Sequence, residues 1–584
     1  MKPAPRAGAF DLTALCVLAL VALALLAWFA GTPPGLPAWV PLAFAAVLAG
    51  RRFRALGTAP RPSADTLACL AIALAYRTPA LVDPWGWVNR DGAYGAFVGM
   101  HLRAGLRPAP VFTEGANYQG TLKGHIAAAL SLVGIDDWSL LIVVASVLLS
   151  LLSVAAGMAL GRRIAGTPAA WITGLYLALP PRFLAVFSLN SVGQYVDVLA
   201  LGGLALALIA RVAHDDGDTS RPAAACAAAG FCLGAAFWQQ PVALSYAAAA
   251  LVVLALRRGR GLLWAMAGFA VGVLPVVLWN VQNEWASGDI MGRDPGELRA
   301  QADALPHLLR RTLTISFPIL AGLAPGHPWA DVAVARFAAV GLIPVALLAY
   351  LVLEGRGIVA SIRARAASAA LLPPLLLLAT VALSWAAASG KVYWRPRYLL
   401  PVVAATAIHL GVVLGRLWGR SRVAAAAVTL GLLVLNVAGL AFPPGDGTTP
   451  RLFAGAEIAA PYARLARSLE EKGIRTGYSD FSLSAPVTMF TGERIVLSPR
   501  LGPTPAYLSD RQEEMVARLG PDAYVLRADD DAKAFAALLD SLGVTYQMDI
   551  DPVPIFYRLS RRVAVEEVAG FRGEEAAEAP GDDS

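Results

Sequence analysis

Asp91-Gly92-Ala93-Tyr94 opens a polar, aromatic segment that ends at Gly134, and its second half reads Glu114-Gly115-Ala116-Asn117-Tyr118-Gln119-Gly120-Thr121-Leu122-Lys123-Gly124. Long apolar runs lie on both sides of this segment. Ionisable residues are expensive inside lipid and mark water-exposed regions or functional sites. The segment therefore predicts the first outward loop of a polytopic membrane enzyme, with Asp91 as its catalytic carboxylate.

The composition of the whole chain supports the membrane class. The 584 residues are 57% hydrophobic and only 15% charged, and the mean hydropathy is +0.59. Soluble domains average roughly 25% charged residues. The bias to Ala, Leu and Val, with Arg far above Lys, is typical of a GC-rich bacterial genome. The four cysteines all lie in apolar runs, which indicates packing residues and no disulfide framework or zinc site.

Many apolar runs approach or reach the ~20 residues that a helix needs to cross a bilayer. We expect a mostly α-helical, polytopic protein with about thirteen transmembrane helices. The predicted spans are 12–31, 37–50, 65–82, 138–160, 167–188, 193–213, 222–240, 243–256, 261–279, 332–353, 369–388, 398–417 and 422–442.

Basic residues orient these spans. Arg and Lys gather before the first span and in every even-numbered gap, for example at Arg51–Arg54 and Arg257–Arg260. The positive-inside rule then makes the N-terminus cytoplasmic. Loops 83–137, 280–331 and 391–397 face outward, as does the chain after about 443. The net charge of +7 indicates contact with anionic lipid headgroups. No nucleic-acid module is found, and we expect a bacterial inner-membrane protein.

The chain divides into three parts. Residues 1–442 form the transmembrane domain with the outward loops 83–137 and 280–331. Residues 443–562 alternate short strands with helices and predict a small extracytoplasmic α/β domain. The predicted strands are 475–478, 494–497, 523–527 and 544–548, and the predicted helices are 457–472, 510–519 and 531–542. Residues 563–584 are acidic and poor in apolar residues, which favours disorder.

Asp91 is the first candidate for chemistry. Tyr94, Val98 and Leu102 follow it at helical spacing, so Asp91 stands at or near the start of a short interfacial helix. A carboxylate there suits a general base. The alternative is a helix N-cap, which Asp often supplies. His101 suits the surface of the same helix. The six histidines show no close pairing with Cys or a carboxylate, so no metal site is indicated.

Three further sets of polar residues belong to the outward side. Arg395 and Arg397 flank Pro396 in a short loop, where two guanidinium groups suit a phosphate; the alternative is interfacial snorkelling. Lys123 follows the Tyr118-Gln119-Gly120 turn and could neutralise a phosphate, or it is part of a solvated loop face. Asp197 opens an apolar run, as a functional residue or as a hydrogen-bond partner of a neighbouring helix.

These residues resemble a known family. Asp91, with His101-Leu102-x-x-Gly105, Tyr118-Gln119-Gly120-Thr121-Leu122 and Leu132-x-Gly134 beyond it, resembles bacterial members of glycosyltransferase family 39. These are GT-C-fold enzymes related to protein O-mannosyltransferases and aminoarabinose transferases. Arg397-Tyr398-Leu399-Leu400-Pro401 resembles the turn before a late span in that family, and 478–495 resembles the outward C-terminal domain of one bacterial subgroup.

The resemblance implies an inverting glycosyltransferase with a polyprenyl-phosphate sugar as donor. Asp91 would deprotonate the acceptor hydroxyl, and Arg395 or Arg397 would hold the lipid phosphate. Tyr94, His101, Tyr118, Gln119, Lys123 and Asp197 would contribute to substrate binding. No cofactor is implied, and a divalent metal is not clearly required. Lipid A, a cell-wall glycan, another lipid-linked sugar and protein Ser/Thr all remain open as acceptors.

The chain departs from the family at two positions. The family usually places a second acid after the first, where this chain has Gly92, and the subgroup often has Glu where this chain has Lys123. Two other functions therefore stay open. One is a transporter or flippase for a lipid-linked substrate, although no inverted repeat is found. The other is a non-catalytic protein that binds the polyprenyl lipid.

Overall fold

The computed structural model describes residues 63–88, 90–105, 109–113, 116–189, 193–214, 221–257, 260–287, 305–323, 333–387, 396–441, 455–501, 510–526, 529–550 and 553–568. The predicted spans 12–31 and 37–50, Arg395 and residues 569–584 of the predicted acidic tail lie outside this part of the chain.

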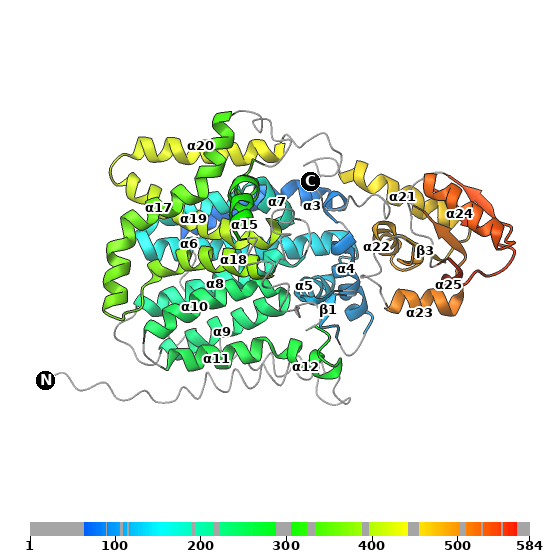
Figure 1. Cartoon of the computed structure of the whole chain (residues 1–584), viewed down its shortest axis with the longest axis horizontal. Coiled ribbons are helices and arrows are strands. Elements are labelled where there is room, and N and C mark those ends of the chain that lie inside the picture. Colours follow the sequence, from blue (N-terminus) through cyan, green and yellow to red (C-terminus); the bar gives the residue numbers. More distant parts are fainter. Residues whose placement is uncertain are drawn as a thin grey trace.

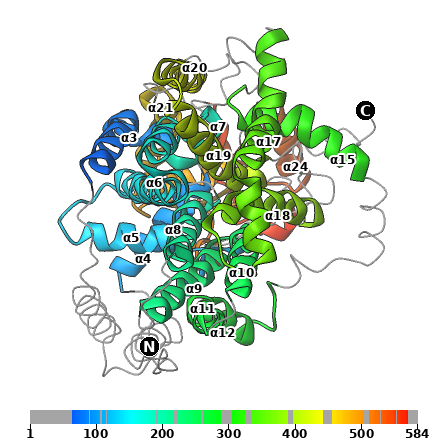
Figure 2. The same cartoon turned by 90° about the vertical axis from the view of Figure 1, so that its left-hand side faces the viewer.

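Long apolar helices pack side by side in one bundle, which Figure 1 shows from the side and Figure 2 from one end. Its helices are α3 (Ala64–Val82), α6 (Trp138–Ala178), α8 (Tyr195–His214), α9 (Arg221–Gln239), α10 (Leu244–Leu256), α11 (Gly261–Gly272), α12 (Leu274–Gln282), α17 (Ala333–Arg363), α18 (Leu372–Ala387), α19 (Leu400–Trp418) and α20 (Arg422–Ala441). Shorter helices α7 (Arg182–Leu189), α15 (Leu305–Arg311) and α16 (Phe317–Leu320) connect them.

The bundle confirms a multi-pass membrane protein but not the number of thirteen spans. In the described part of the chain, 7 helices are long and apolar enough to cross a membrane, or 8 if α11 and α12, bent by 48°, form one span. Helices α9 and α10 are apolar but shorter. Helix α6 has 41 residues and breaks at Ala165 and Gly166, so that it covers two of the predicted spans.

Glycine lets two of these helices approach closely. A β-carbon added to Gly268 of α11 would lie 2.0 Å from the Ala227 carbonyl oxygen of α9, and one added to Gly230 would lie 1.9 Å from the Ala265 carbonyl oxygen. Small residues are common at helix contacts inside membranes because backbones can then pack directly on each other. The α9–α11 pair is thus fixed by glycines from both helices.

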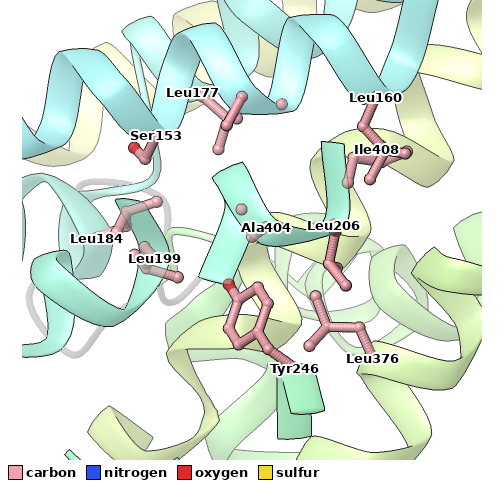
Figure 3. Close-up of a pocket in the computed structure, with 13 residues that line it drawn as sticks. Ser153, Leu160, Leu177, Leu184, Leu199, Leu206, Tyr246, Leu376, Ala404 and Ile408 are labelled. Atoms are coloured by element: carbon pink, nitrogen blue, oxygen red, sulfur yellow. The ribbon is translucent and has the colours of Figure 1, made fainter. Parts of the chain in front are cut away.

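A small apolar cavity lies inside the bundle, between α6, α8, α10, α18 and α19 (Figure 3). Its volume is about 30 Å³, and its lining includes Leu206, Leu376 and Ala404. Tyr246 also lines it, and the buried Tyr246 hydroxyl has no hydrogen-bond partner among the described residues. Its walls are almost entirely apolar, and none of its lining residues is a candidate site residue from the sequence.

The loop after α3 forms a folded layer at one end of the bundle. It contains the 3-10 helix η1 (Pro84–Trp87), α4 (Arg90–Arg103), the antiparallel pair β1 (Phe112–Thr113) and β2 (Ala116–Gly120), and α5 (Leu122–Ser131). Helices α4 and α5 touch closely, because a β-carbon on Gly124 would lie 2.6 Å from the Val98 side chain. This contact fixes the helix that carries Asp91 against the helix that carries Lys123.

The C-terminal part is an α/β unit with a five-stranded sheet in the order β4-β3-β5-β7-β6. The strands are β3 (Thr476–Ser479), β4 (Val496–Ser498), β5 (Ala523–Val525), β6 (Gln547–Asp549) and β7 (Ile555–Tyr557). The helices are α21 (Gly455–Glu471), α22 (Phe481–Phe490), α23 (Asp510–Leu519), α24 (Asp529–Ser541) and α25 (Val565–Val568). Strands β3, β4 and β5 pair in parallel, whereas β7 pairs antiparallel with β5 and β6.

Three elements of this unit, α22, β7 and α25, were not predicted. Helix α22 begins at the N-cap Asp480, whose carboxylate accepts hydrogen bonds from the Ser482 and Leu483 backbone N–H groups, and it contains Pro486. Helix α25 falls in the segment predicted to be disordered. There Val563 and Val568 are buried in the core of the α/β unit.

The α/β unit packs against the layer formed by η1 and α4 (Figure 1). The ring centroids of Trp85 and Phe490 are 4.5 Å apart. Ala485 and Met489 of α22 belong to the same buried cluster as Tyr94 and Phe97 of α4. The unpredicted helix α22 therefore forms part of the support of the helix that carries Asp91.

Candidate active site

Asp91 lies in the first turn of α4, as the helical spacing predicted. The helix begins at Arg90, so Asp91 is inside it and is not the N-cap. The partly exposed Asp91 carboxylate interacts electrostatically with Lys123 and Tyr195. Negative charge is favourable at a helix N-terminus, which is where the Asp91 carboxylate stands.

Lys123 and Asp197 form a buried ion pair. The Lys123 Nζ and Asp197 Oδ2 atoms are 3.4 Å apart, and the two side chains are 1% and 0% exposed. The solvated loop face that was one interpretation of Lys123 is therefore wrong. The partner of Asp197 belongs to a neighbouring helix, α5, as one interpretation expected, but the two side chains meet as an ion pair without a hydrogen bond among the described residues. Burial lowers the pKa of the Lys123 ammonium, and the Asp197 carboxylate opposes that shift.

Tyr195 connects the acidic and basic sides of the site. Asp91, Arg397 and Tyr118 all lie within electrostatic reach of this buried phenol. Its ring meets that of Tyr398 edge to face, with the centroids 6.2 Å apart. Arg397 and Tyr398 lie in the 3-10 helix η5 (Pro396–Leu399), which precedes α19. The sequence did not single out Tyr195 alone, although it stands two residues before Asp197 in the polar run that opens α8.

Arg397 supplies the positive group of this cluster. Its guanidinium carbon lies 5.4 Å from the centroid of the Tyr398 ring. Its Nε atom is buried and has no hydrogen-bond partner in the described ranges. A guanidinium N–H without a partner beside phenols can bind an anionic oxygen. Arg395, the second predicted arginine, lies outside the described residues, so its role stays a prediction.

Two glutamines at the end of α9 hold the backbone around the site. Gln239 Oε1 accepts a hydrogen bond from the Leu122 N–H at 3.1 Å, beside Lys123. Gln240 Nε2 donates to the Gly193 carbonyl oxygen at 3.0 Å, in the turn before α8. These bonds fix the starts of α5 and α8, which carry the two partners of the buried ion pair. Neither glutamine was among the candidate site residues that the sequence singled out.

The remaining predicted residues divide into two groups. Tyr118 and Gln119 lie on β2, where Tyr118 interacts with both Tyr195 and Arg397. Tyr94 is 3% exposed and packs edge to face on Phe97 in the core below α4. His101 is 3% exposed and bonds to Glu493 of the α/β unit, so the expected surface position is wrong. The structure thus does not bring Tyr94 and His101 to the cluster around Tyr195.

Among the residues that the structure describes, no group of three or more His, Cys, Asp or Glu side chains could hold a metal ion. The functional groups of the cluster are two carboxylates, one ammonium, one guanidinium and several phenols. Such a set can accept a proton and can neutralise an anion.

Comparison with known proteins shows similarity at the level of the fold. No protein-family model matches the chain, and no curated protein sequence matches it. The structure of ArnT from Cupriavidus metallidurans bound to undecaprenyl phosphate is 17% identical, with a TM-score of 0.50, and the match covers 87% of this chain and 98% of ArnT. The apo structure of the same protein gives a TM-score of 0.49 at 17% identity, covering 86% and 98%.

A more distant likeness is to the oligosaccharyltransferase AglB from Archaeoglobus fulgidus, in complex with an inhibitory peptide and a dolichol-phosphate. It has a TM-score of 0.43 and 12% identity, and the match covers 81% of this chain and 71% of AglB. The match to ArnT shows that the chain has the GT-C fold that the sequence resemblance implied.

Proposed function

We propose that this protein is an integral-membrane glycosyltransferase that transfers a sugar from a polyprenyl-phosphate donor to an acceptor hydroxyl. One observation carries the proposal. Asp91 and Arg397, which are more than 300 residues apart in the sequence, both lie within electrostatic reach of the buried Tyr195. A base and an anion-binding guanidinium are the two groups that such a transfer needs.

The reaction follows from these two groups. The Asp91 carboxylate accepts the proton of the acceptor hydroxyl, whose oxygen forms a bond to the anomeric carbon of the sugar. The bond from that carbon to the phosphate oxygen breaks on the opposite face, so that the configuration is inverted. The electron pair of the broken bond remains on the phosphate, and Arg397 stabilises the negative charge that develops there.

The Lys123–Asp197 ion pair contributes to the electrostatic potential at Asp91. Their ion pair places a buried positive charge within electrostatic reach of Asp91. An opposite charge nearby favours the ionised form of a carboxylate. Tyr118 and Gln119 on β2 lie beside the same cluster and are suited to contact the polar part of a substrate.

The fold supports the donor class. The similar ArnT structure is a complex with undecaprenyl phosphate, a polyprenyl phosphate. The basic clusters of the sequence support an active site at the extracytoplasmic face of the bacterial inner membrane. In that orientation the N-terminus is cytoplasmic, and the α/β unit stands with α4 and α5 outside the membrane.

The test is a transfer assay with the purified protein in lipid nanodiscs. Polyprenyl-phosphate sugars are supplied with a panel of envelope acceptors, and the release of free polyprenyl phosphate is measured by mass spectrometry. We expect Asp91→Asn to abolish release. The matched control is Asp65→Asn, which removes a 36% exposed carboxylate from the first turn of α3, where it pairs with Arg162, and should leave release unchanged.

Three results would contradict the proposal. Full release by Asp91→Asn would exclude Asp91 as the base. Tight binding of the donor by the wild-type protein, with no turnover on any acceptor, would identify a non-catalytic lipid binder. Movement of an intact lipid-linked sugar across proteoliposomes, without covalent transfer, would identify a flippase.

A further inference from the structure

We infer that Glu493 of the α/β unit is a positioning residue that holds α4, and with it Asp91, through His101. The inference rests on the proposed function, because it gives Glu493 a role in the reaction through the helix that carries the base. Glu493 lies in the C-terminal α/β unit, which contains neither Asp91 nor Arg397.

The contact itself is short and largely enclosed. His101 Nε2 and Glu493 Oε1 are 2.6 Å apart, and the side chains are 4% and 21% exposed. The His101 ring is stacked on Phe97 of the same helix, with an interplanar angle of 10°. A short bond to a buried imidazole fixes the orientation of both partners. It joins two residues 392 positions apart in the sequence.

The backbone of Glu493 is held in an uncommon conformation. Its φ is 61°, in the left-handed region, directly after Gly492 with φ 59°. This conformation is unfavourable for an ordinary L-residue, whereas glycine adopts it freely. The turn is closed by the bond from the Glu493 N–H to the Thr488 carbonyl oxygen at 2.9 Å. The turn itself would accept glycine at 493, so a side chain there indicates a function for that side chain.

The two ends of α4 are restrained from different directions. Near its start, Trp85 of η1 packs on Phe490, the last residue of α22. In its last turn, His101 bonds to Glu493, three residues after the end of α22. On the opposite side, Gly99 is packed against Trp138 of α6, where an added β-carbon would lie 2.7 Å from the Trp138 ring.

Together these contacts limit how α4 can move. It has 14 residues and is therefore about 20 Å long. The bundle contacts one side of α4 through Trp138. Helix α22 and Glu493 contact another side of α4. Losing the Glu493 carboxylate would leave the last turn of α4 without its bond to the α/β unit. A shift of the helix by as little as 1 Å can lower a reaction rate by about 100-fold.

The experiment compares three substitutions at one position. Glu493→Ala removes the carboxylate and keeps the β-carbon in the left-handed conformation. Glu493→Gly removes the carboxylate and relieves the backbone. Glu493→Gln retains an oxygen acceptor for His101. The control is Glu470→Ala, which breaks an exposed ion pair with Arg494 in the same unit, with side chains 42% and 71% exposed.

Two measurements are made on the full-length protein in nanodiscs. The first is hydrogen–deuterium exchange of the α4 amides, residues 90–103, which needs no substrate. The second is the separate determination of kcat and of KM for the donor. We expect faster α4 exchange, and a fall in kcat of roughly 10-fold or more with KM within about 2-fold, for both the Ala and the Gly variant. The Gln variant should retain most of the wild-type kcat, and the control all of it.

The outcomes separate this inference from the proposed function. Unchanged α4 exchange in the Ala and Gly variants would overturn the inference, whatever the activity. Recovery of kcat by Glu493→Gly relative to Glu493→Ala would also overturn it, because backbone strain would then be the cause. Faster α4 exchange in a protein that transfers no sugar in its wild-type form would support the restraint by Glu493 and refute the proposed function.

Discussion

Lys123 and Asp197 form an ion pair at 3.4 Å, with both side chains enclosed by protein. The pair joins α5 of the outer layer to α8 of the bundle. Removing one member of a buried pair leaves the other charge without compensation, which typically destabilises a protein by about 3–5 kcal/mol.

We therefore expect Lys123→Met and Asp197→Leu each to lower the midpoint of thermal unfolding strongly. The double variant Lys123→Met/Asp197→Leu should recover most of the loss, because an apolar pair of similar volume is often neutral. Thermal unfolding followed by intrinsic fluorescence measures all three. Single variants as stable as the wild type would show that the pair is hydrated in the protein.

Arg397 should be needed for the departure of the phosphate. Arg397→Gln removes the guanidinium, and the loss of one such stabilising donor lowers kcat by about 100-fold to 1,000-fold. The control is Arg416→Gln in α19, where the guanidinium pairs with Glu354 and is 51% exposed. Steady-state kinetics with varied donor concentration gives kcat and KM for both. A wild-type kcat in Arg397→Gln would exclude this role.

Two glycine-to-alanine changes should have opposite effects on stability, because one glycine lies in the close α9–α11 contact and the other has open space around it. In Gly268→Ala the new methyl group would meet the Ala227 carbonyl oxygen at 2.0 Å, so the helices must separate. We expect a loss of about 1–3 kcal/mol. In Gly355→Ala, on α17, nothing lies within 4 Å of the added carbon.

For Gly355→Ala we expect a gain of up to about 1 kcal/mol, because alanine favours a helix over glycine. Reversible unfolding in mixed micelles compares the two variants. Equal stability of Gly268→Ala and the wild type would mean that α9 and α11 pack less closely than the structure shows.

The two tyrosines Tyr246 and Tyr350 should respond differently to loss of their hydroxyl groups. The Tyr246 hydroxyl is buried without a hydrogen-bond partner among the described residues, and removing such a group avoids a desolvation penalty of about 1–3 kcal/mol. Tyr246→Phe should therefore raise the unfolding midpoint. The Tyr350 hydroxyl donates to the Ala370 carbonyl oxygen at 2.7 Å.

Tyr350→Phe serves as the matched control and should lower stability by about 0.5–1.5 kcal/mol. The comparison uses the same unfolding assay for both variants. A loss of stability in Tyr246→Phe would indicate that a water molecule in the neighbouring cavity bonds to the hydroxyl.

The sequence predicts those features that depend on neighbouring residues. Apolar runs located the bundle helices, and the spacing of Tyr94, Val98 and Leu102 located the start of α4. Strands β3 to β6 lie within a few residues of the predicted strands. The number of spans was less secure, because α9 and α10 are apolar but short and α6 contains a break.

Features that depend on distant residues were not predictable in this way. His101 looked like a surface residue because its partner, Glu493, lies in another part of the chain. Lys123 and Asp197 were recognised separately, and only the fold shows that they meet. Helix α22 was missed because its first residues alternate apolar and polar side chains and it contains Pro486, so its sequence shows no helical period.

The bond between His101 and Glu493 also has a consequence for biosynthesis. A ribosome makes the chain from its N-terminus, and domains generally fold in that order. Residue 493 is made after every bundle helix, so α4 enters its layer long before its partner exists. A nascent or truncated chain can thus hold Asp91 and Arg397 and still lack this restraint on α4. On the proposed function, full transfer activity would appear only once the α/β unit has folded.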